Sequence, residues 1–558
     1  MQEDFMNKMT RAGCIFAWIA GILSAGNVWA AEVPALPPSG FNDSGVQLNR
    51  TRQYLQWQQT MQKIADGRKT EKVEGSEADD TKKDTNALQF RLEKITADAS
   101  DLLTEEEIQK EAAPYIGKEI TLQDLYGIVE KINALYSEKG YMTCRAYLAP
   151  QTIKKGIVHI SLLEGKTGKV EIRGNRTTRA DYIRDRIGLE EGETANIGHI
   201  NKKLLRFNAT NDAQLRISMR AGETYGTTDY VITAAEPQQY VFGLFSDNAG
   251  SKTSGLYRGG MFWQDRSLTG NRDSLMMTSV FSKGTKSFGA SYSAPINTSG
   301  TKLGVNYSTN SVHIIDGPLE PLDVRGHSYA YSFSLTQPLV TSEKVKSEIG
   351  LDYGYQNSKT DFMRMPWVDD TVRGASIFFD QINYGKTTVF YQRHAYRFGN
   401  YNNNISDSMD RFGKYVMNML YQRVFSAGQT LTVRADGQLS SSNYLPSAEQ
   451  FYIGGMYSVR GYTESLLGGD NGVSGSIEYS LPMSPDKMTS AYFFLDGGHV
   501  WGANVWGDKN LVGAGFGIKS TIGDHVSLNI GMGLPLINEV NEEEQSHARV
   551  HFSLNSQF

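Results

Sequence analysis

The chain has 558 residues, a net charge of −5, a hydrophobic fraction of 39% and a mean hydropathy of −0.41. The charge gives no reason to expect nucleic acid as a partner, and the length allows several domains. The polar average suits a soluble protein, but it also suits a membrane β-barrel, in which half of each strand is polar. The 29 Tyr and 24 Phe, against 2 Cys and 15 Pro, favour the barrel.

Residues 1–30 have the pattern of a secretory signal peptide. Lys8 and Arg11 form a basic start, and residues 14–23 form an apolar core that is too short to span a bilayer comfortably. Small or compact residues before the end of this segment predict cleavage after Ala30. The alternative is a membrane anchor at the same place.

The next segment, residues 31–66, begins Pro-rich and then carries a weak helical stripe from Val46 to Asp66. Such a helix is too polar to form a core on its own. Residues 67–87 mix charged and small residues without periodicity, which predicts a flexible linker.

Two modules with the same order of elements follow, over residues 88–165 and 166–237. Each is predicted as a strand, two helices and two strands. In the first module, Thr104 and Glu107 form a capping box at the start of one helix, and Gly140 ends the next. Two small α/β domains are therefore predicted.

Residues 238–558 alternate apolar and polar side chains in many short stretches, which are separated by Gly-, Asn- and Asp-rich turns. Alternation gives each strand one face for lipid and one for a polar lumen, and a closed barrel leaves no backbone group unpaired. The length fits about sixteen spanning strands. The predicted fold is a membrane all-β barrel of about sixteen antiparallel strands, preceded by the two α/β domains and the helix. Its lumen would be an aqueous channel unless something fills it.

A long loop, about residues 442–470, contains Val459-Arg460-Gly461-Tyr462. Two predicted strands later, alternate residues share one face: Tyr492, Phe494, Asp496 and Gly498. Exposure of Asp496 to lipid would be costly, so this face is predicted to line the lumen.

Arg460, on an inward-folded loop, can pair bidentately with the carboxylate of Asp496. Gly461 allows the loop backbone to turn tightly beside this pair. Glu478, on the predicted lumen face of the preceding strand, is a second candidate partner. The alternative is that Arg460 is an ordinary surface-loop residue.

Enzyme signatures are absent from the sequence, so no catalytic activity, cofactor or metal is predicted. Gly385-Lys386-Thr387 resembles part of a phosphate loop, but Asp380 stands where that loop needs glycine. The nine histidines show no metal-ligand spacing, and there is no nucleophile elbow.

The VRGY loop, followed by Phe494-Leu495-Asp496-Gly497-Gly498, resembles the outer-membrane transporters of two-partner secretion. These form the TpsB family, of the haemolysin secretion/activation type, within the superfamily that joins POTRA domains to a barrel. The two modules resemble POTRA domains, and residues 141–151 resemble part of the first one. The resemblance implies that the contact between Arg460 and Asp496 holds the loop inside the barrel. Further residues belong to this lock or lie beside it on the lumen face: Gly461, Tyr462, Phe494, Gly498 and Glu478.

Family members often carry a basic residue shortly after the glutamate that matches Glu478. Here Tyr479-Ser480 follows, so the role of Glu478 stays open. The resemblance also implies that the helix near residues 46–66 plugs the lumen; a disordered periplasmic tail is the alternative. The terminal aromatic residue, Phe558, matches the family's signal for barrel insertion.

The resemblance implies an outer-membrane protein transporter with its POTRA domains in the periplasm. It would recognise a large unfolded exoprotein, the TpsA partner, through that protein's N-terminal secretion domain and secrete it through the barrel. Further expected partners are outer-membrane lipid and, during biogenesis, the barrel-assembly machinery; a monomer is expected. One alternative is a barrel-assembly factor (insertase), which usually has more POTRA modules and no plug helix. A diffusion porin is another, but it leaves the modules and the loop unexplained.

Overall fold

The computed structural model describes residues 43–66, 89–317, 319–503, 505, 507–523 and 525–558. The predicted signal peptide and the linker over 67–87 lie outside these residues. The compact unit that contains every element below is Asn42–Phe558. None of the described helices is long and apolar enough to cross a membrane.

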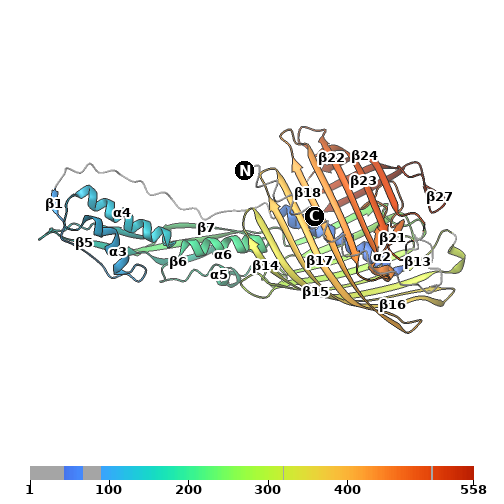
Figure 1. Ribbon diagram of the computed structural model, residues 1–558, viewed down its shortest axis with the longest axis horizontal. Coiled ribbons are helices and arrows are strands. Elements are labelled where there is room, and N and C mark those ends of the chain that lie inside the picture. Colours follow the sequence, from blue (N-terminus) through green and yellow to red (C-terminus); the bar gives the residue numbers. More distant parts are fainter. Residues whose placement is uncertain (1–42, 67–88, 318, 504, 506, 524) are drawn as a thin grey trace, which may run out of the picture. The chain divides into compact units, whose positions relative to one another are not determined.

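Sixteen antiparallel strands close into a barrel, as Figure 1 shows in green to red. They are β9 (Tyr240–Asp247), β10 (Arg258–Asp265), β11 (Ser274–Phe281), β12 (Thr285–Pro295), β13 (Lys302–His313), β14 (Arg325–Thr341), β15 (Val345–Phe362), β16 (Met365–Tyr384), β17 (Thr388–Asn403), β18 (Ser408–Val424), β19 (Thr430–Ser440), β22 (Asn471–Pro482), β23 (Thr489–Trp501), β24 (Asn510–Ile522), β25 (Val526–Pro535) and β28 (Arg549–Gln557). Strand β28 pairs with β9 and closes the ring. The predicted fold class is confirmed.

The first module is built on a three-stranded sheet of order β2-β5-β4. The chain forms β1 (Gln89–Arg91), β2 (Lys94–Ala97), α3 (Glu105–Ala112), β3 (Glu119–Thr121), α4 (Leu122–Glu138), β4 (Cys144–Tyr147) and β5 (Ile157–Glu164). The sequence predicted a single first strand in this module. The structure has two short strands instead, because β1 pairs with β3 and β2 pairs with β5. The capping box is present: Thr104 Oγ1 accepts from the Glu107 N–H at 3.2 Å, and Glu107 accepts from the Thr104 N–H at 2.9 Å.

The second module repeats this plan with the sheet order β6-β8-β7. Its elements are β6 (Lys166–Arg173), α5 (Ala180–Ile187), α6 (Ile197–Thr210), β7 (Gln214–Ala221) and β8 (Thr227–Ala235). In both modules the outer two strands of the sheet flank a central one, and the helices bury aliphatic side chains against its face. The repeat in the sequence therefore corresponds to two modules with the same sheet order in the structure.

Helix α2 (Ser44–Asp66), drawn in blue in Figure 1, lies against the inner side of the barrel. It contacts β13, β14, β15 and the short helix η3 (Ser447–Glu449) of the long loop. The helix begins two residues before the predicted start because Asp43 Oδ1 accepts a hydrogen bond from the Val46 N–H at 2.8 Å, which satisfies a free donor of the first turn.

Candidate functional site

The long loop between β19 and β22 folds into a compact unit inside the barrel. It contains η3 and a small hairpin of β20 (Phe451–Ile453) and β21 (Leu467–Gly469). Its apolar side chains form a cluster with residues of β23 and β24: Ile453, Val459, Tyr462, Leu467, Val500 and Leu511, all buried. A loop with its own core can hold a fixed position in a lumen.

Arg460 and Asp496 are in direct contact. The Arg460 Nε lies 2.7 Å from Asp496 Oδ2 and its Nη2 lies 2.8 Å from Oδ1, so the pair is bidentate. The Arg460 backbone N–H also donates to Oδ2, at 3.0 Å. Asp496 is 1% exposed, so this charge is fully removed from solvent and satisfied by one arginine.

The remaining donors of the Arg460 guanidinium are directed at β22. Its Nη1 donates to Glu478 Oε2 at 2.8 Å and its Nη2 to Ser476 Oγ at 3.1 Å. The guanidinium carbon, Cζ, lies over the Phe494 ring, 3.5 Å from the ring centre, which adds a cation–π contact. Glu478, whose role the sequence left open, is therefore placed beside Arg460.

Strand β23 separates its two faces as the alternation requires. Tyr492 and Phe494 are 2% and 5% exposed, whereas Phe493 and Leu495 are 54% and 51% exposed. The first pair shares the face of Asp496, and the second faces the outside of the barrel. Gly498 continues the inner face, where a Cβ would lie 3.0 Å from Ile453 of the loop.

Gly461 and Tyr462 continue the loop along β24, β25 and β28. Gly461 has φ +102° and lies so close to β25 that a Cβ would meet Pro535 N at 2.9 Å, so only glycine fits. Its N–H donates to His551 Nε2 at 3.3 Å. The Tyr462 hydroxyl donates to the Val512 carbonyl at 2.8 Å and accepts from the Ile537 N–H at 3.1 Å.

Sequence reasoning missed several charged partners of the loop. Lys519 on β24 forms an ion pair with Glu478, so the basic partner comes from a neighbouring strand and not from the residues after the glutamate. The sequence could have indicated Lys519, because it alternates with Gly515 and Gly517 on the face of β24 that points into the lumen. Three further ion pairs fix the loop to the barrel: Glu449 with Lys414 (2.7 Å), Glu449 with Arg397 (3.0 Å), and Glu464 with Arg549 (2.8 Å).

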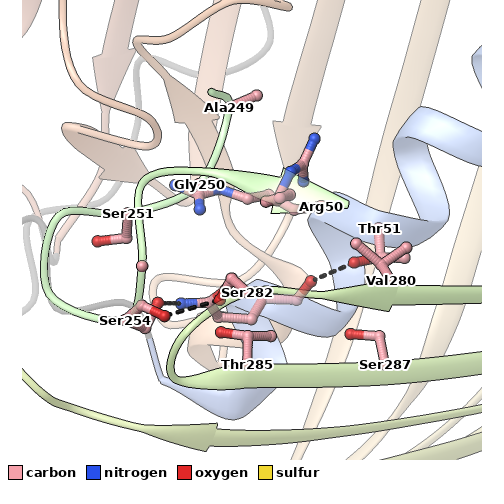
Figure 2. Close-up of a pocket in the computed structure, with 13 residues that line it drawn as sticks. Arg50, Thr51, Ala249, Gly250, Ser251, Ser254, Val280, Ser282, Thr285 and Ser287 are labelled. Atoms are coloured by element: carbon pink, nitrogen blue, oxygen red, sulfur yellow. Dashed lines mark hydrogen bonds between the residues drawn. The ribbon is translucent and has the colours of Figure 1, made fainter. Parts of the chain in front are cut away.

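The first turns of α2 are held by polar side chains. The Ser44 Oγ donates to the Lys359 carbonyl at 3.0 Å, Gln47 Nε2 donates to Ser254 Oγ at 3.1 Å, and Arg50 Nε donates to Ser465 Oγ at 2.9 Å. Figure 2 shows the small pocket on this side of α2, which is lined by Arg50 and Thr51 of the helix and by hydroxyl side chains of the barrel: Ser251, Ser254, Ser282, Thr285 and Ser287. This end of the helix therefore contacts both the barrel wall and the loop.

Phe558 ends the chain beside the first barrel strand. Its N–H donates to the Phe242 carbonyl at 2.8 Å, and its carbonyl accepts from the Phe242 N–H at 3.0 Å. The ring is 52% exposed and stacks on His525, with the ring centres 5.5 Å apart. Within the described residues, no cluster of His, Cys, Asp and Glu side chains could hold a metal ion.

Two family models match the chain. One, described as haemolysin secretion/activation protein ShlB/FhaC/HecB, matches residues 226–520. The other, a POTRA domain of ShlB type, matches residues 90–165.

Similar proteins span most of the chain. The heme/hemopexin transporter protein HuxB of Haemophilus influenzae (strain 86-028NP) is 22% identical over 460 residues, which are 77% of this chain and 80% of HuxB. The outer membrane transporter CdiB of Escherichia coli O6:K15:H31 (strain 536) is 23% identical over 477 residues, which are 80% and 79% of the two chains.

Solved structures share the fold. CdiB from Escherichia coli has a TM-score of 0.68 at 19% identity and covers 94% of this chain and 100% of its own. BamA from Haemophilus ducreyi, lacking POTRA domains 1–3, has a TM-score of 0.52 at 14% identity and covers 84% of this chain and 100% of its own. The secretion-family model spans more than half of the chain, so the chain belongs to the haemolysin secretion/activation protein family ShlB/FhaC/HecB and is an outer-membrane transporter of two-partner secretion that exports a partner exoprotein.

Proposed function

We propose that the chain captures its unfolded TpsA exoprotein in the periplasm, through the exoprotein's N-terminal secretion domain, and exports it through the barrel lumen as an extended chain. Residues 88–165 and 166–237 act as POTRA capture domains, 238–558 form the channel, and 31–66 carry the plug. The transporter works as a monomer surrounded by outer-membrane lipid. The supporting observation is that α2 lies in the lumen without pairing to any barrel strand, so it can leave without breaking the barrel.

In this proposal the loop and the plug have different tasks. The ion pairs of Arg460, Glu449 and Glu464 keep the loop folded against the inner wall while the exoprotein passes. Helix α2 moves out and opens the path. Folding of the exoprotein on the cell surface supplies the driving force, because the periplasm holds no ATP.

The edges of the two POTRA sheets differ in how far they are available to the exoprotein. In the first domain, the Asn133 side chain bonds both backbone groups of Ala146 on β4, at 2.7 and 3.3 Å. In the second, the Asn208 side chain bonds both backbone groups of Leu215 on β7, at 2.7 and 2.9 Å. An amide on a neighbouring helix thus covers part of one outer edge of each sheet, β4 in the first and β7 in the second.

Strand β4 ends one residue after its covered position, whereas β7 continues for six residues to Ala221. Backbone groups point alternately to the two sides of a strand, so Ile217 and Met219 point outward as Leu215 does. Among the described residues, none bonds the outward groups of these two. We therefore place strand addition by the exoprotein at the β7 edge.

The test is Met219→Pro, which removes one outward N–H without breaking the pairing of β7 with β8. Met219→Ala is the matched control, because it loses the side chain and keeps the donor. The chain is co-expressed with its TpsA exoprotein, and exoprotein in the medium is compared with that in the periplasm. We expect Met219→Pro to retain exoprotein in the periplasm and Met219→Ala to export it. Equal export by both variants would exclude the β7 edge, and export from cells lacking the chain would refute the function itself.

A further inference from the structure

The lumen wall carries an apolar patch beside the last turns of α2, formed by neighbouring residues of three strands. These are Ile382 on β16, Val389 and Tyr391 on β17, and Leu420 on β18, each 5% exposed or less. We call this set the lumen socket. The inner face of a barrel that carries water or a polar chain is normally polar, so four large apolar side chains there need an explanation.

The socket forms two adjacent rows across the strands. Ile382 pairs with Tyr391, which pairs with Leu420, and Val389 pairs with Tyr384 in the next row. Rows on one face are two residues apart along each strand, about 6.6 Å. That distance is also the spacing of side chains i and i+2 in an extended polypeptide, so the socket can hold two successive side chains from one face of such a chain.

The socket lies at the periplasmic mouth of the lumen. Strand β9 begins directly after the POTRA domains, and the turn of residues 385–387 between β16 and β17 is at the same end of the barrel as that beginning. The next row toward the outside is polar, with Asp380 and Arg393 in an ion pair at 2.9 Å. An exoprotein that enters from the periplasm would therefore meet the socket before the polar lumen.

In the closed state the socket is occupied by the last turns of α2. Ile64 is 5% exposed and packs in the same cluster, with Met61 beside it. The Tyr384 hydroxyl donates to the Ile64 carbonyl at 3.2 Å, which fixes the end of the helix over the socket. The chain thus fills its own socket with an aliphatic side chain.

We propose that the lumen socket is a binding site for aliphatic side chains of the exoprotein in transit, and that Ile64 occupies it as an internal mimic of the exoprotein. This inference rests on the proposed export through the lumen. It adds that an entering exoprotein first binds the lumen wall through its aliphatic side chains. When α2 leaves, four apolar side chains would face water unless another apolar group covers them. An extended exoprotein with aliphatic residues at alternate positions covers them, so its arrival and the release of α2 compete for one site.

Secretion by a variant lacking residues 31–66 tests the socket apart from the plug. In that background we compare Val389→Ser with Val280→Ser, because Val280 is also a buried lumen valine beside α2 but lies near Arg50 and Thr51, outside the socket. We expect Val389→Ser to lower exoprotein secretion and Val280→Ser to leave it at the level of the deletion alone. Equal secretion by the two variants at equal outer-membrane levels would overturn the proposal.

Channel recordings give a second readout that does not need secretion. The deletion variant is placed in a planar bilayer, and synthetic peptides that alternate valine with asparagine, or serine with asparagine, are added on the periplasmic side. We expect the valine peptide to block the current with a dwell time that Val389→Ser shortens by about tenfold, since two buried methyl groups are lost. The serine peptide should give brief blocks both with the unchanged socket and with the Val389→Ser variant.

The two readouts separate the socket from the function on which it rests. If neither peptide enters the open channel and the deletion variant secretes nothing, export through the lumen is wrong. If both peptides enter and block equally, with or without Val389→Ser, export through the lumen stands and the socket proposal is refuted.

Discussion

The long loop and helix α2, the proposed plug, share one lumen, but they are held there by different kinds of contact. The guanidinium of Arg460 makes four hydrogen bonds to three side chains, two of which are carboxylates. Arg50 of α2 makes one hydrogen bond to a serine, and its Nη2 has no partner within the described part of the chain. A bidentate pair of arginine and carboxylate joins opposite charges through two parallel bonds, whereas a serine hydroxyl offers a single neutral acceptor. The lumen therefore combines a loop fixed by buried ion pairs with a helix held by weaker, separable contacts.

The largest effect is expected from breaking the lock. Arg460→Ala leaves the buried carboxylate of Asp496 without its partner, and Asp496→Ala leaves Arg460 with Glu478 as its remaining carboxylate. Breaking a buried ion pair costs about 3–5 kcal/mol. We expect secretion to fall by more than tenfold while the barrel stays folded, because the strand ladders do not involve these side chains. The measurement is exoprotein in the medium, normalised to the folded barrel in the outer membrane. Arg325→Ala is the control, since the Arg325 side chain is 65% exposed in its pair with Asp323 and such pairs contribute little.

The double variant sharpens this test. If Arg460 and Asp496 act as one contact, the double variant should secrete as poorly as each single variant. Defects that add, with the loop equally protected from proteolysis in all variants, would show that the two residues act separately.

The next largest effect is expected from removing helix α2. Deleting residues 31–66 removes α2 together with its polar and apolar contacts. We expect the channel conductance in planar bilayers to rise well above that of the intact chain. Asp43→Ala, which removes the cap that accepts from Val46, should increase the frequency of opening without changing the fully open level. An unchanged conductance in the deletion variant would exclude α2 as the plug.

Local patterns predicted the barrel well, because alternation along a strand is a property of the sequence itself. The sixteen strands, the family, the outer-membrane location and the transport function are confirmed. The inner face of β23 followed from a single charged residue, Asp496, whose exposure to lipid would be costly. Arg460 was found because its motif and the later aspartate occur together.

Contacts that depend on register across strands were not predictable. Lys519 reaches Glu478 across β23, so only the paired sheet brings their side chains together. The lumen socket likewise joins three strands, none of which has an unusual pattern of its own. The amide caps by Asn133 and Asn208 depend on where a helix packs beside an edge, which local periodicity does not specify.

A smaller effect is expected at the margin of the lock. Glu478→Gln keeps an acceptor for Arg460 and leaves the bidentate pair with Asp496 intact, so secretion should fall less than with Asp496→Ala. Lys519→Ala should have a still weaker effect, because the Lys519 side chain is 43% exposed and exposed pairs contribute about 0.2–1 kcal/mol. Exoprotein secretion, measured for all three variants side by side, gives the order. A defect in Lys519→Ala equal to that of Asp496→Ala would show that the lock is centred on Glu478.

The smallest effect is expected at Phe558, which lies outside both the loop and the plug and serves barrel insertion in our reading. Deleting the residue removes its ring and the two backbone hydrogen bonds with Phe242, whereas Phe558→Ala removes the ring alone. If the ring is the signal for the barrel-assembly machinery, both variants should lower the outer-membrane level of the chain under low expression, and Phe558→Tyr should restore it. Secretion per folded barrel should stay unchanged, since the ring is half exposed on the outside and contacts neither the lock nor α2. Normal levels of Phe558→Ala, with a defect confined to the deletion, would instead assign the effect to the lost pairing with β9, where each hydrogen bond contributes about 0.5–1.5 kcal/mol.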